Sequence, residues 1–224
     1  NAALAHYSPS QDNSRRLSVD EMYLSDTGGQ YLDGTTDITR TVHWGTPTPL
    51  QKEAYTRVLM GNINLSRLVF PPNTAGRLVE SFARQALWEV GLNYGHGTGH
   101  GIGNFLSVHE WPVGFQSNNV PLTVGMFTSI EPGYYRDGEF GIRIEDVALV
   151  VEAQAKSGEN PFLAFEVVSL VPYDRNLIDL SLLSKEQIQY LNTYYETIRA
   201  RVGPELQRQQ LHEEYEWLQQ NTKP

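Results

Sequence analysis

The chain has 224 residues, of which 40% are hydrophobic and 19% charged, a composition typical of a globular protein with a buried core. Its formal net charge is −9 and no basic patch is visible, which argues against a nucleic-acid partner. Cysteine is absent, which excludes disulfides, thiolate metal ligands and cysteine nucleophiles. No apolar run reaches the roughly 20 residues of a bilayer-spanning helix, and no secretory signal pattern opens the chain.

The first 42 residues predict two paired strands. Residues 1–18 are polar and rich in turn formers, and residues 19–26 then alternate apolar with polar side chains, the pattern of a half-buried strand. Residues 36–42 are rich in β-branched side chains, which favour a second strand. Asp26 and Asp37 are therefore expected at the ends of adjacent strands, where aspartate is normally depleted. Turn formation is the alternative explanation for each aspartate.

The apolar spacing of residues 48–69 and 73–90 predicts two helices. The first opens with a capping box formed by Thr48 and Gln51. The second begins at a polar cap at position 73 or 74 and ends at Gly91. Its buried stripe is expected to contain Leu78, Phe82, Leu87 and Val90. Both helices need only a sheet to pack against, so we predict a structural role for them.

Residues 96–103, with the sequence His-Gly-Thr-Gly-His-Gly-Ile-Gly, place two histidines four positions apart among glycines. That spacing occurs in helical zinc motifs, but each glycine would cost about 1 kcal/mol in a helix interior. The stretch therefore predicts a strand or loop whose backbone approaches a ligand closely. A turn with incidental histidines is the alternative.

The second half predicts further strands and a helical end. We expect a loop over residues 111–123 and strands over 126–131, 141–151 and 165–171. On the strand 141–151, Arg143 and Glu145 share a face, and a simple ion pair between them is the alternative to a functional role. The helical end begins at residue 184 with a capping box of Ser184 and Gln187. It is expected to break at Gly203-Pro204 and to resume over 206–218.

Five polar side chains at predicted strand ends suggest a metal site; they are Asp26, Asp37, His100, Glu131 and Glu145. Four carboxylates gathered in one cleft would repel strongly and would be costly to desolvate. Their four negative charges balance two divalent cations. Oxygen ligands with one imidazole suit manganese, cobalt or zinc. Two such ions bridged by carboxylates hold a hydroxide that is nucleophilic at neutral pH. The residues alone therefore predict metal-assisted hydrolysis.

Several segments resemble the proline-specific metallopeptidases of the pita-bread fold, a family with aminopeptidase P, prolidase, methionine aminopeptidase and the metal-free creatinase. The similar segments are residues 26–31, 37–40, 96–101, 130–133 and 141–145. The resemblance implies an α+β fold, with a curved, mostly antiparallel sheet covered by helices on its outer face. It also implies that residues 1–224 are one catalytic metallopeptidase domain whose amino-terminal part, with the preceding domains, is missing.

The resemblance also assigns roles to individual residues. Asp26, Asp37, His100, Glu131 and Glu145 are similar to the family's metal ligands. Glu131 is also similar to the residue that shuttles a proton. His96 and His109 resemble substrate-binding histidines that assist catalysis, one near the proline side of the scissile bond and the other at the oxyanion. His6 resembles a further histidine at the site, although a residue in a polar terminus is more often solvated surface. Arg143 resembles the arginine that orients the ligand two residues later.

The activity implied is that of a metal-dependent aminopeptidase that cleaves between an amino-terminal residue and a following proline, using a hydroxide bridging two metal ions. A prolidase-like dipeptidase and a non-catalytic pita-bread binding module are the alternatives. Resemblance to the membrane-bound branch of aminopeptidase P favours zinc and the extracellular face of the plasma membrane. Its membrane contact would require a lipid anchor absent from this chain. The cytosolic branch favours manganese and the cytoplasm.

The expected partners are peptides with proline in second position, and a homodimer is compatible with the sequence. The tripeptide Asn64-Leu65-Ser66 is the chain's one glycosylation sequon, and because such tripeptides arise often by chance it says little about secretion.

Overall fold

The structure, a computed structural model, describes residues 1–105, 107–116, 118–154, 158 and 160–224. Its largest sheet has six strands in the order β5-β12-β11-β8-β6-β7. Along the chain these are β5 (Val69–Phe70), β6 (His100–Ile102), β7 (Glu110–Gly114), β8 (Phe127–Ile130), β11 (Asp146–Ala153) and β12 (Phe162–Val167). Three smaller pairs accompany it: β1 (Met22–Thr27) with β4 (Ile38–His43), β2 (Gln30–Tyr31) with β3 (Gly34–Thr35), and β9 (Gly133–Arg136) with β10 (Phe140–Arg143). Every strand pairing among the described residues is antiparallel.

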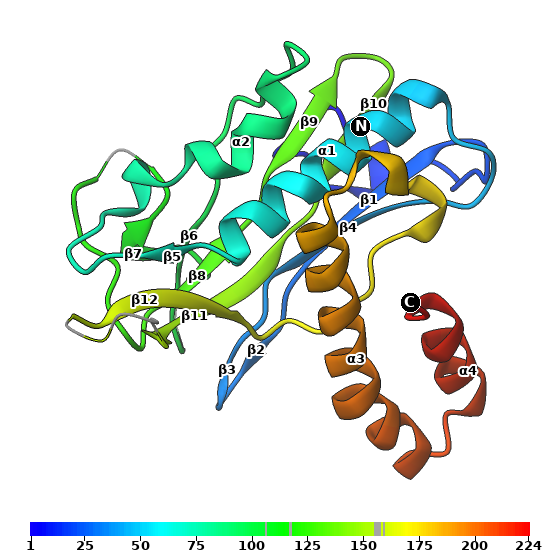
Figure 1. The fold of residues 1–224 in the computed structure, drawn as a ribbon. Coiled ribbons are helices and arrows are strands. Elements are labelled where there is room, and N and C mark those ends of the chain that lie inside the picture. Colours follow the sequence, from blue (N-terminus) through cyan, green and yellow to red (C-terminus); the bar gives the residue numbers. More distant parts are fainter. Residues whose placement is uncertain (106, 117, 155–157, 159) are drawn as a thin grey trace.

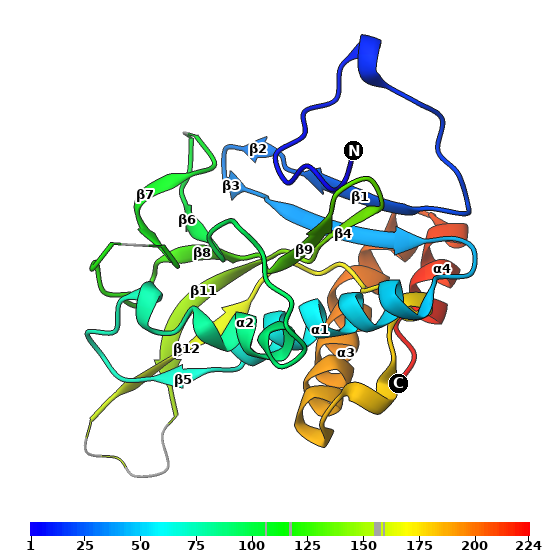
Figure 2. The same cartoon turned by 90° about the horizontal axis from the view of Figure 1, so that it is seen from above.

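The described residues form four α-helices beside the sheets (Figure 1): α1 (Pro49–Ser66), α2 (Ser81–Trp88), α3 (Lys185–Arg208) and α4 (His212–Asn221). Short 3-10 turns occur at Gln11–Asn13, Gly76–Leu78, Arg175–Leu177 and Leu180–Leu182. Figure 2 shows α1, α2 and α3 on one side of the sheets, opposite the β2–β3 hairpin and the start of the chain. None of these helices has the length and apolar character that crossing a bilayer would take, within the ranges described. The expected α+β arrangement of a curved sheet with helices on one face is thus observed.

Two apolar clusters fill the space between helices and sheets. One joins α1 and α3 to the β9–β10 pair, with Leu59, Ile142 and Tyr194 among its buried members. The other lies on the six-stranded sheet, with Phe115, Ile130 and Val150 among its members. Because both clusters lie on the helical side, the opposite side of the strands is left for polar side chains.

The capped helices are confirmed. Thr48 and Gln51 form the capping box that opens α1, and Ser184 and Gln187 form the one that opens α3. The histidine stretch is a loop up to Gly99 and a strand from His100, the start of β6, as its glycines predicted. The strands expected over 19–26, 36–42 and 126–131 correspond to β1, β4 and β8.

The buried stripe expected for the second helix is correct at Leu87 and wrong at its other three positions. The segment folds as the Gly76–Leu78 turn followed by α2, and Leu78, Phe82 and Val90 are exposed. The buried side chains of α2 are Ala83, Ala86 and Leu87. Small residues face α1 because the two helices touch through their backbones: a Cβ on Gly61 would lie 2.1 Å from the carbonyl oxygen of Ala83.

Three strand boundaries also differ from expectation. Residues 110–114 form β7 inside the expected loop 111–123, in which residue 117 lies outside the described residues. The expected strand 165–171 is β12, and it ends at Val167. The expected strand 141–151 is divided into β10 and β11, because Glu145 leaves one sheet for another: its amide donates to the carbonyl oxygen of Thr39 at 3.1 Å.

The break expected at Gly203-Pro204 is also wrong, because α3 continues to Arg208. Pro204 is exposed, so the loss of one backbone hydrogen bond there is outweighed by the packing of the helix's buried side chains, such as Tyr194 and Ile198. The chain turns instead at Gln210, whose φ is 59°.

The glycosylation sequon Asn64-Leu65-Ser66 lies inside α1. The side-chain oxygen of Asn64 accepts a hydrogen bond from Gln187 Nε2 at 2.8 Å. A glycan on Asn64 would therefore displace the start of α3.

Replacing Gly61 by alanine should destabilise the fold. Helix propensity favours alanine by about 1 kcal/mol, but the new methyl group would meet the backbone of Ala83, and such overpacking costs about 1–3 kcal/mol. Thermal unfolding should therefore give a lower midpoint for Gly61→Ala. Gly95→Ala is the control, since a Cβ there has nothing within 4 Å. A rise in midpoint for Gly61→Ala would contradict this account of the α1–α2 contact.

Candidate active site

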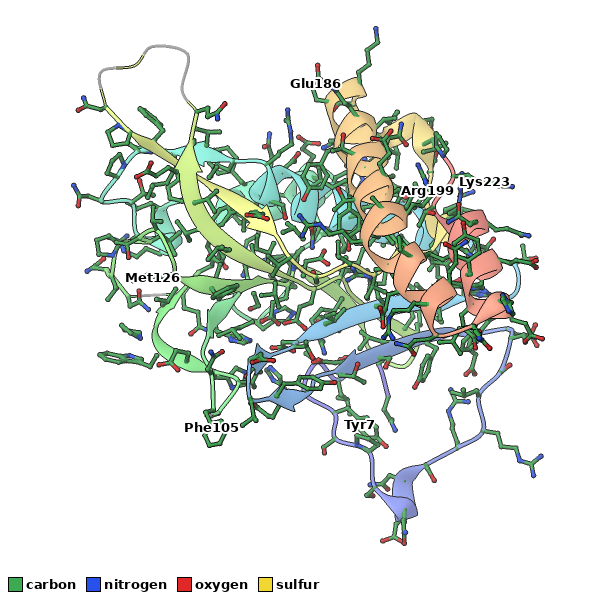
Figure 3. The ribbon with its side chains drawn as sticks, turned by 90° about the horizontal axis from the view of Figure 1, so that it is seen from below. Tyr7, Phe105, Met126, Glu186, Arg199 and Lys223 are labelled. Atoms are coloured by element: carbon green, nitrogen blue, oxygen red, sulfur yellow. The ribbon has the colours of Figure 1, made fainter. Side chains whose placement is uncertain are left out.

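A cavity of about 380 Å³ opens among β1, β4, β6, β8 and the 144–145 crossing. All nine residues singled out from the sequence line it; they are His6, Asp26, Asp37, His96, His100, His109, Glu131, Arg143 and Glu145. Its rim is formed in part by the β2–β3 hairpin. Asn104, which follows β6, approaches that hairpin: a Cβ on Gly34 would lie 3.6 Å from Asn104 Oδ1. Phe105, the next residue, projects outward and is 79% exposed (Figure 3).

Four predicted metal ligands converge at the centre of this cavity. His100 Nε2 lies 3.2 Å from Asp37 Oδ2 and 3.2 Å from Glu131 Oε1. Asp37, His100 and Glu145 offer ligand atoms that all lie within 4.8 Å of one another. Each side chain stands at the end of a strand: Asp37 directly before β4, Glu131 directly after β8, and Glu145 between β10 and β11.

Asp26, the fifth predicted ligand, lies on β1 beside Thr39 of β4. Its Oδ2 accepts a hydrogen bond from Arg143 Nη2 at 2.7 Å. This ion pair holds the Asp26 carboxylate at the edge of the cluster. The alternative that Arg143 forms a simple ion pair with Glu145 is wrong. Within the described residues, the ion pair of Arg143 is with Asp26. Arg143 reaches Glu145 through Thr39, whose Oγ1 accepts from Arg143 Nε at 3.3 Å and donates to Glu145 Oε1 at 2.7 Å.

The gathered carboxylates perturb one another. Burial, followed by the charges of Glu131, Asp37 and Asp26, raises the pKa of the Glu145 carboxyl, which is 1% exposed. Burial alone would lower the pKa of His100, but its hydrogen bonds to Asp37 and Glu131 outweigh burial and raise that pKa to about 10. A protonated imidazole therefore partly neutralises the cluster. Divalent cations would do so more fully, and a set of carboxylate oxygens with one imidazole suits them, so the residues present fit a metal centre.

Hydroxyl groups that sequence reasoning missed hold the carboxylates in place. Ser129 Oγ donates to Glu131 Oε1 at 2.8 Å, and Thr39 Oγ1 donates to Glu145. Each lies two residues from a predicted ligand on the same strand face, so the period of two along a strand was the signal that could have found them. Such partners fix the orientation of the groups that bind a metal.

Tyr135 is a further missed residue, and it joins two predicted ones. Its hydroxyl lies 2.7 Å from His96 Nε2 and accepts from Arg143 Nη1 at 2.8 Å. Burial lowers the pKa of His96, so this imidazole is neutral at physiological pH. The ring of His96 lies 4.9 Å from that of Tyr94 and 6.4 Å from that of His6. His96 therefore presents a neutral, largely aromatic wall to the cavity.

His109 lies beside His100 in the wall of the cavity. Its ring is 4.4 Å from that of His100, edge to face. In the lining of the cavity, His6 thus lies next to His96, and His109 lies next to His100. A ligand held at the carboxylates would be flanked by imidazoles.

This arrangement defines a class of protein, the hydrolases that hold metal ions between carboxylates on a curved antiparallel sheet. Residues 1–152 match metallopeptidase family M24, and the chain belongs to this family. Residues 161–224 match the C-terminal region of peptidase M24. The pita-bread fold expected from the sequence is therefore confirmed.

Curated relatives resemble the chain along its whole length. Xaa-Pro aminopeptidase 2 of Homo sapiens is 75% identical over 224 residues, which are 100% of this chain and 33% of the relative. A probable Xaa-Pro aminopeptidase P of Pyricularia oryzae is 46% identical over 230 residues, covering 100% of this chain and 37% of the relative. The chain thus spans about a third of the length of these relatives.

Solved structures of related peptidases have a similar fold. The X-prolyl aminopeptidase of Caenorhabditis elegans, described as a cytosolic enzyme with a di-nuclear active site, superposes with a TM-score of 0.96 at 40% identity, covering 100% of this chain and 37% of that one. The prolidase of Pyrococcus furiosus superposes with a TM-score of 0.61 at 32% identity, over 72% of this chain and 44% of that one.

Metal binding at this cavity should strengthen as the pH rises. A bound ion needs the imidazole of His100 without its proton, yet that proton has a pKa of about 10 in the metal-free protein. Each proton released on binding changes the affinity about tenfold per pH unit. Titration with Zn²⁺ or Mn²⁺ against a competing chelator at pH 6.5, 7.5 and 8.5 (roughly one-unit steps) checks this. An affinity independent of pH, after correction for the chelator, would refute it.

Proposed function

We propose that the protein is a metal-dependent Xaa-Pro aminopeptidase, which hydrolyses the bond between an amino-terminal residue and a following proline. The observation that carries the proposal is the convergence of Asp37, His100, Glu131 and Glu145 in one cavity. The identity of 75% to human Xaa-Pro aminopeptidase 2 supports the substrate class. We also propose that residues 1–224 belong to one catalytic domain, since the two family matches share the core around α1 and α3.

Five side chains are proposed to hold two divalent ions: Asp26, Asp37, His100, Glu131 and Glu145. The di-nuclear site of the C. elegans relative supports the number two. When bound, the ions supply Lewis-acid polarisation of the scissile carbonyl and a lowered pKa for water. Oxygen ligands with one imidazole suit both zinc and manganese. We propose zinc first, because the resemblance to the membrane-bound branch favours it, and manganese as the alternative.

The remaining roles follow from where the side chains lie. Glu131 lies 3.2 Å from His100, and we assign it the transfer of a proton to the leaving proline nitrogen. His109, next to His100, is assigned a hydrogen bond to the oxyanion that develops on the carbonyl. His96 and His6 line the cavity together with Tyr94 and Tyr135 nearby, and this aromatic wall suits the apolar pyrrolidine ring of proline. Arg143 holds Asp26 in place.

Location is proposed from the same resemblance. Similarity to the membrane-bound branch of aminopeptidase P supports the extracellular face of the plasma membrane. The cytosolic C. elegans relative supports the cytoplasm as the alternative.

Replacing Glu131 by glutamine should remove turnover and leave the fold intact. The amide keeps one oxygen ligand but cannot carry the proton, and loss of a general acid–base group costs about 10²–10⁴-fold in rate. The measurement is kcat on a peptide with proline second, in Zn²⁺ or Mn²⁺, with activity of the unmodified protein abolished by a chelator. Glu139→Gln is the control, since Glu139 is exposed on the neighbouring β9–β10 hairpin and pairs with Arg136. Near-normal kcat in Glu131→Gln with full metal content would refute the role.

Peptides of increasing length distinguish the proposed aminopeptidase from a dipeptidase. The prolidase of P. furiosus shares the fold, which keeps a dipeptidase activity as the second candidate. We expect kcat/KM for Xaa-Pro peptides of three residues or more (roughly three to nine) to equal or exceed that for the dipeptide, because remote binding energy assists catalysis. Cleavage confined to dipeptides would instead support a prolidase, and metal loading without cleavage of any peptide would support a binding module.

A further inference from the structure

A buried ion pair lies directly behind the cavity. Arg40 Nη2 and Asp146 Oδ1 are 2.7 Å apart, and Asp146 is 0% exposed. Asp146 follows Glu145 in the chain, and Arg40 stands three residues after Asp37. The pair therefore adjoins two proposed metal ligands without entering the cavity, whose lining does not include it.

Arg40 joins the two backbone segments that carry those ligands. Its Nη1 donates to the carbonyl oxygen of Glu145 at 2.7 Å and to that of Thr39 at 2.9 Å. The amide of Glu145 also donates to the carbonyl oxygen of Thr39. The planar guanidinium thus fixes the spacing between β4 and the crossing at residues 144–145, because its donors have a rigid geometry.

The carboxyl-terminal region completes the surroundings of the pair. Ser169 Oγ donates to Asp146 Oδ1 at 2.7 Å, and Tyr173 Oη donates to Asp146 Oδ2 at 2.7 Å. The guanidinium of Arg40 donates to the carbonyl oxygen of Val171 at 2.8 Å and lies 4.6 Å from the centre of the Tyr173 ring. Tyr194 of α3 lies within 3.2 Å of the same guanidinium.

These contacts cross the boundary between the two matched regions. Arg40 and Asp146 belong to residues 1–152, whereas Ser169, Tyr173 and Tyr194 belong to residues 161–224. A buried ion pair keeps its geometry only when its remaining donors and acceptors are satisfied. For Asp146, two of the donors come from the carboxyl-terminal region and one, Asn62, from α1.

We propose that residues 161–224 act as a positioning element for the metal centre, with Tyr173 and Ser169 as positioning residues that act through Asp146 and Arg40. The proposal rests on the proposed function, since it presupposes that the cavity binds metal. Shifting Asp146 or Arg40 moves the backbone of Glu145 relative to β4, and so changes the distance between Asp37 and Glu145. The carboxyl-terminal region thereby sets metal affinity without contributing a side chain to the cavity.

Tyr173→Phe tests this with the ring and its packing retained. Loss of the hydroxyl should raise the dissociation constant for Mn²⁺ or Zn²⁺ severalfold, less than the roughly 10–100-fold loss caused by removing a direct partner of a metal ligand, because Tyr173 acts through Asp146. We expect kcat to fall with KM unchanged, and Ser169→Ala to act in the same direction. Measurements use the full chain, by titration against a chelator and by thermal unfolding without metal.

Tyr195→Phe is the matched control. Tyr195 is as buried as Tyr173, at 2% exposure, and its hydroxyl donates to the carbonyl oxygen of Tyr173 at 3.4 Å rather than to the ion pair. The proposal holds if Tyr173→Phe and Ser169→Ala weaken metal binding while Tyr195→Phe does not, at comparable losses of stability. Equal metal affinity in all three variants and the unmodified chain overturns it. If the unmodified chain binds no metal, the proposed function itself fails.

Discussion

Mutual repulsion among buried carboxylates is the constraint around which this molecule is arranged. Asp37, Glu131 and Glu145 meet in one cavity with a single imidazole between them. Isolated charges are not kept in such a place unless they are paired or coordinate metals. The strands that carry them come from separate sheets, so the fold brings together side chains that would otherwise separate. Divalent ions bound in the cavity would balance the charge of these carboxylates.

The site has two kinds of wall around that charge. Arg143 and Tyr135 form a hydrogen-bonded chain from Asp26 to His96, while Ser129 and Thr39 hold Glu131 and Glu145 from the sides. The first wall presents rings to the cavity and the second presents hydroxyl groups to the ligands. Under the proposed function, the first wall would contact the peptide and the second would support the metal ligands, and Arg143 is hydrogen-bonded to both, through Tyr135 and Thr39.

The metal ligands could be predicted from the sequence because they are charged residues at strand ends, where charged side chains are uncommon. Thr39, Ser129 and Tyr135 could not be predicted in the same way, because uncharged side chains of these types are normal in strands. The buried face of α2 was also missed, since the contact with Gly61 depends on how two helices meet rather than on the spacing within one. A helix break was predicted at Pro204 because helix propensity depends on local sequence and does not include the tertiary packing that stabilises α3.

The crossing at Glu145 has a mechanical consequence. Asp26 and Asp37 stand on the β1–β4 pair, whereas His100 and Glu131 stand on the six-stranded sheet. Glu145 lies between them, where the chain passes from β10 to β11 of the six-stranded sheet and its backbone pairs with Thr39 of β4. An ion bound by all of these groups would add a further link between the β1–β4 pair and the six-stranded sheet, beside the Thr39–Glu145 contact that joins them without metal.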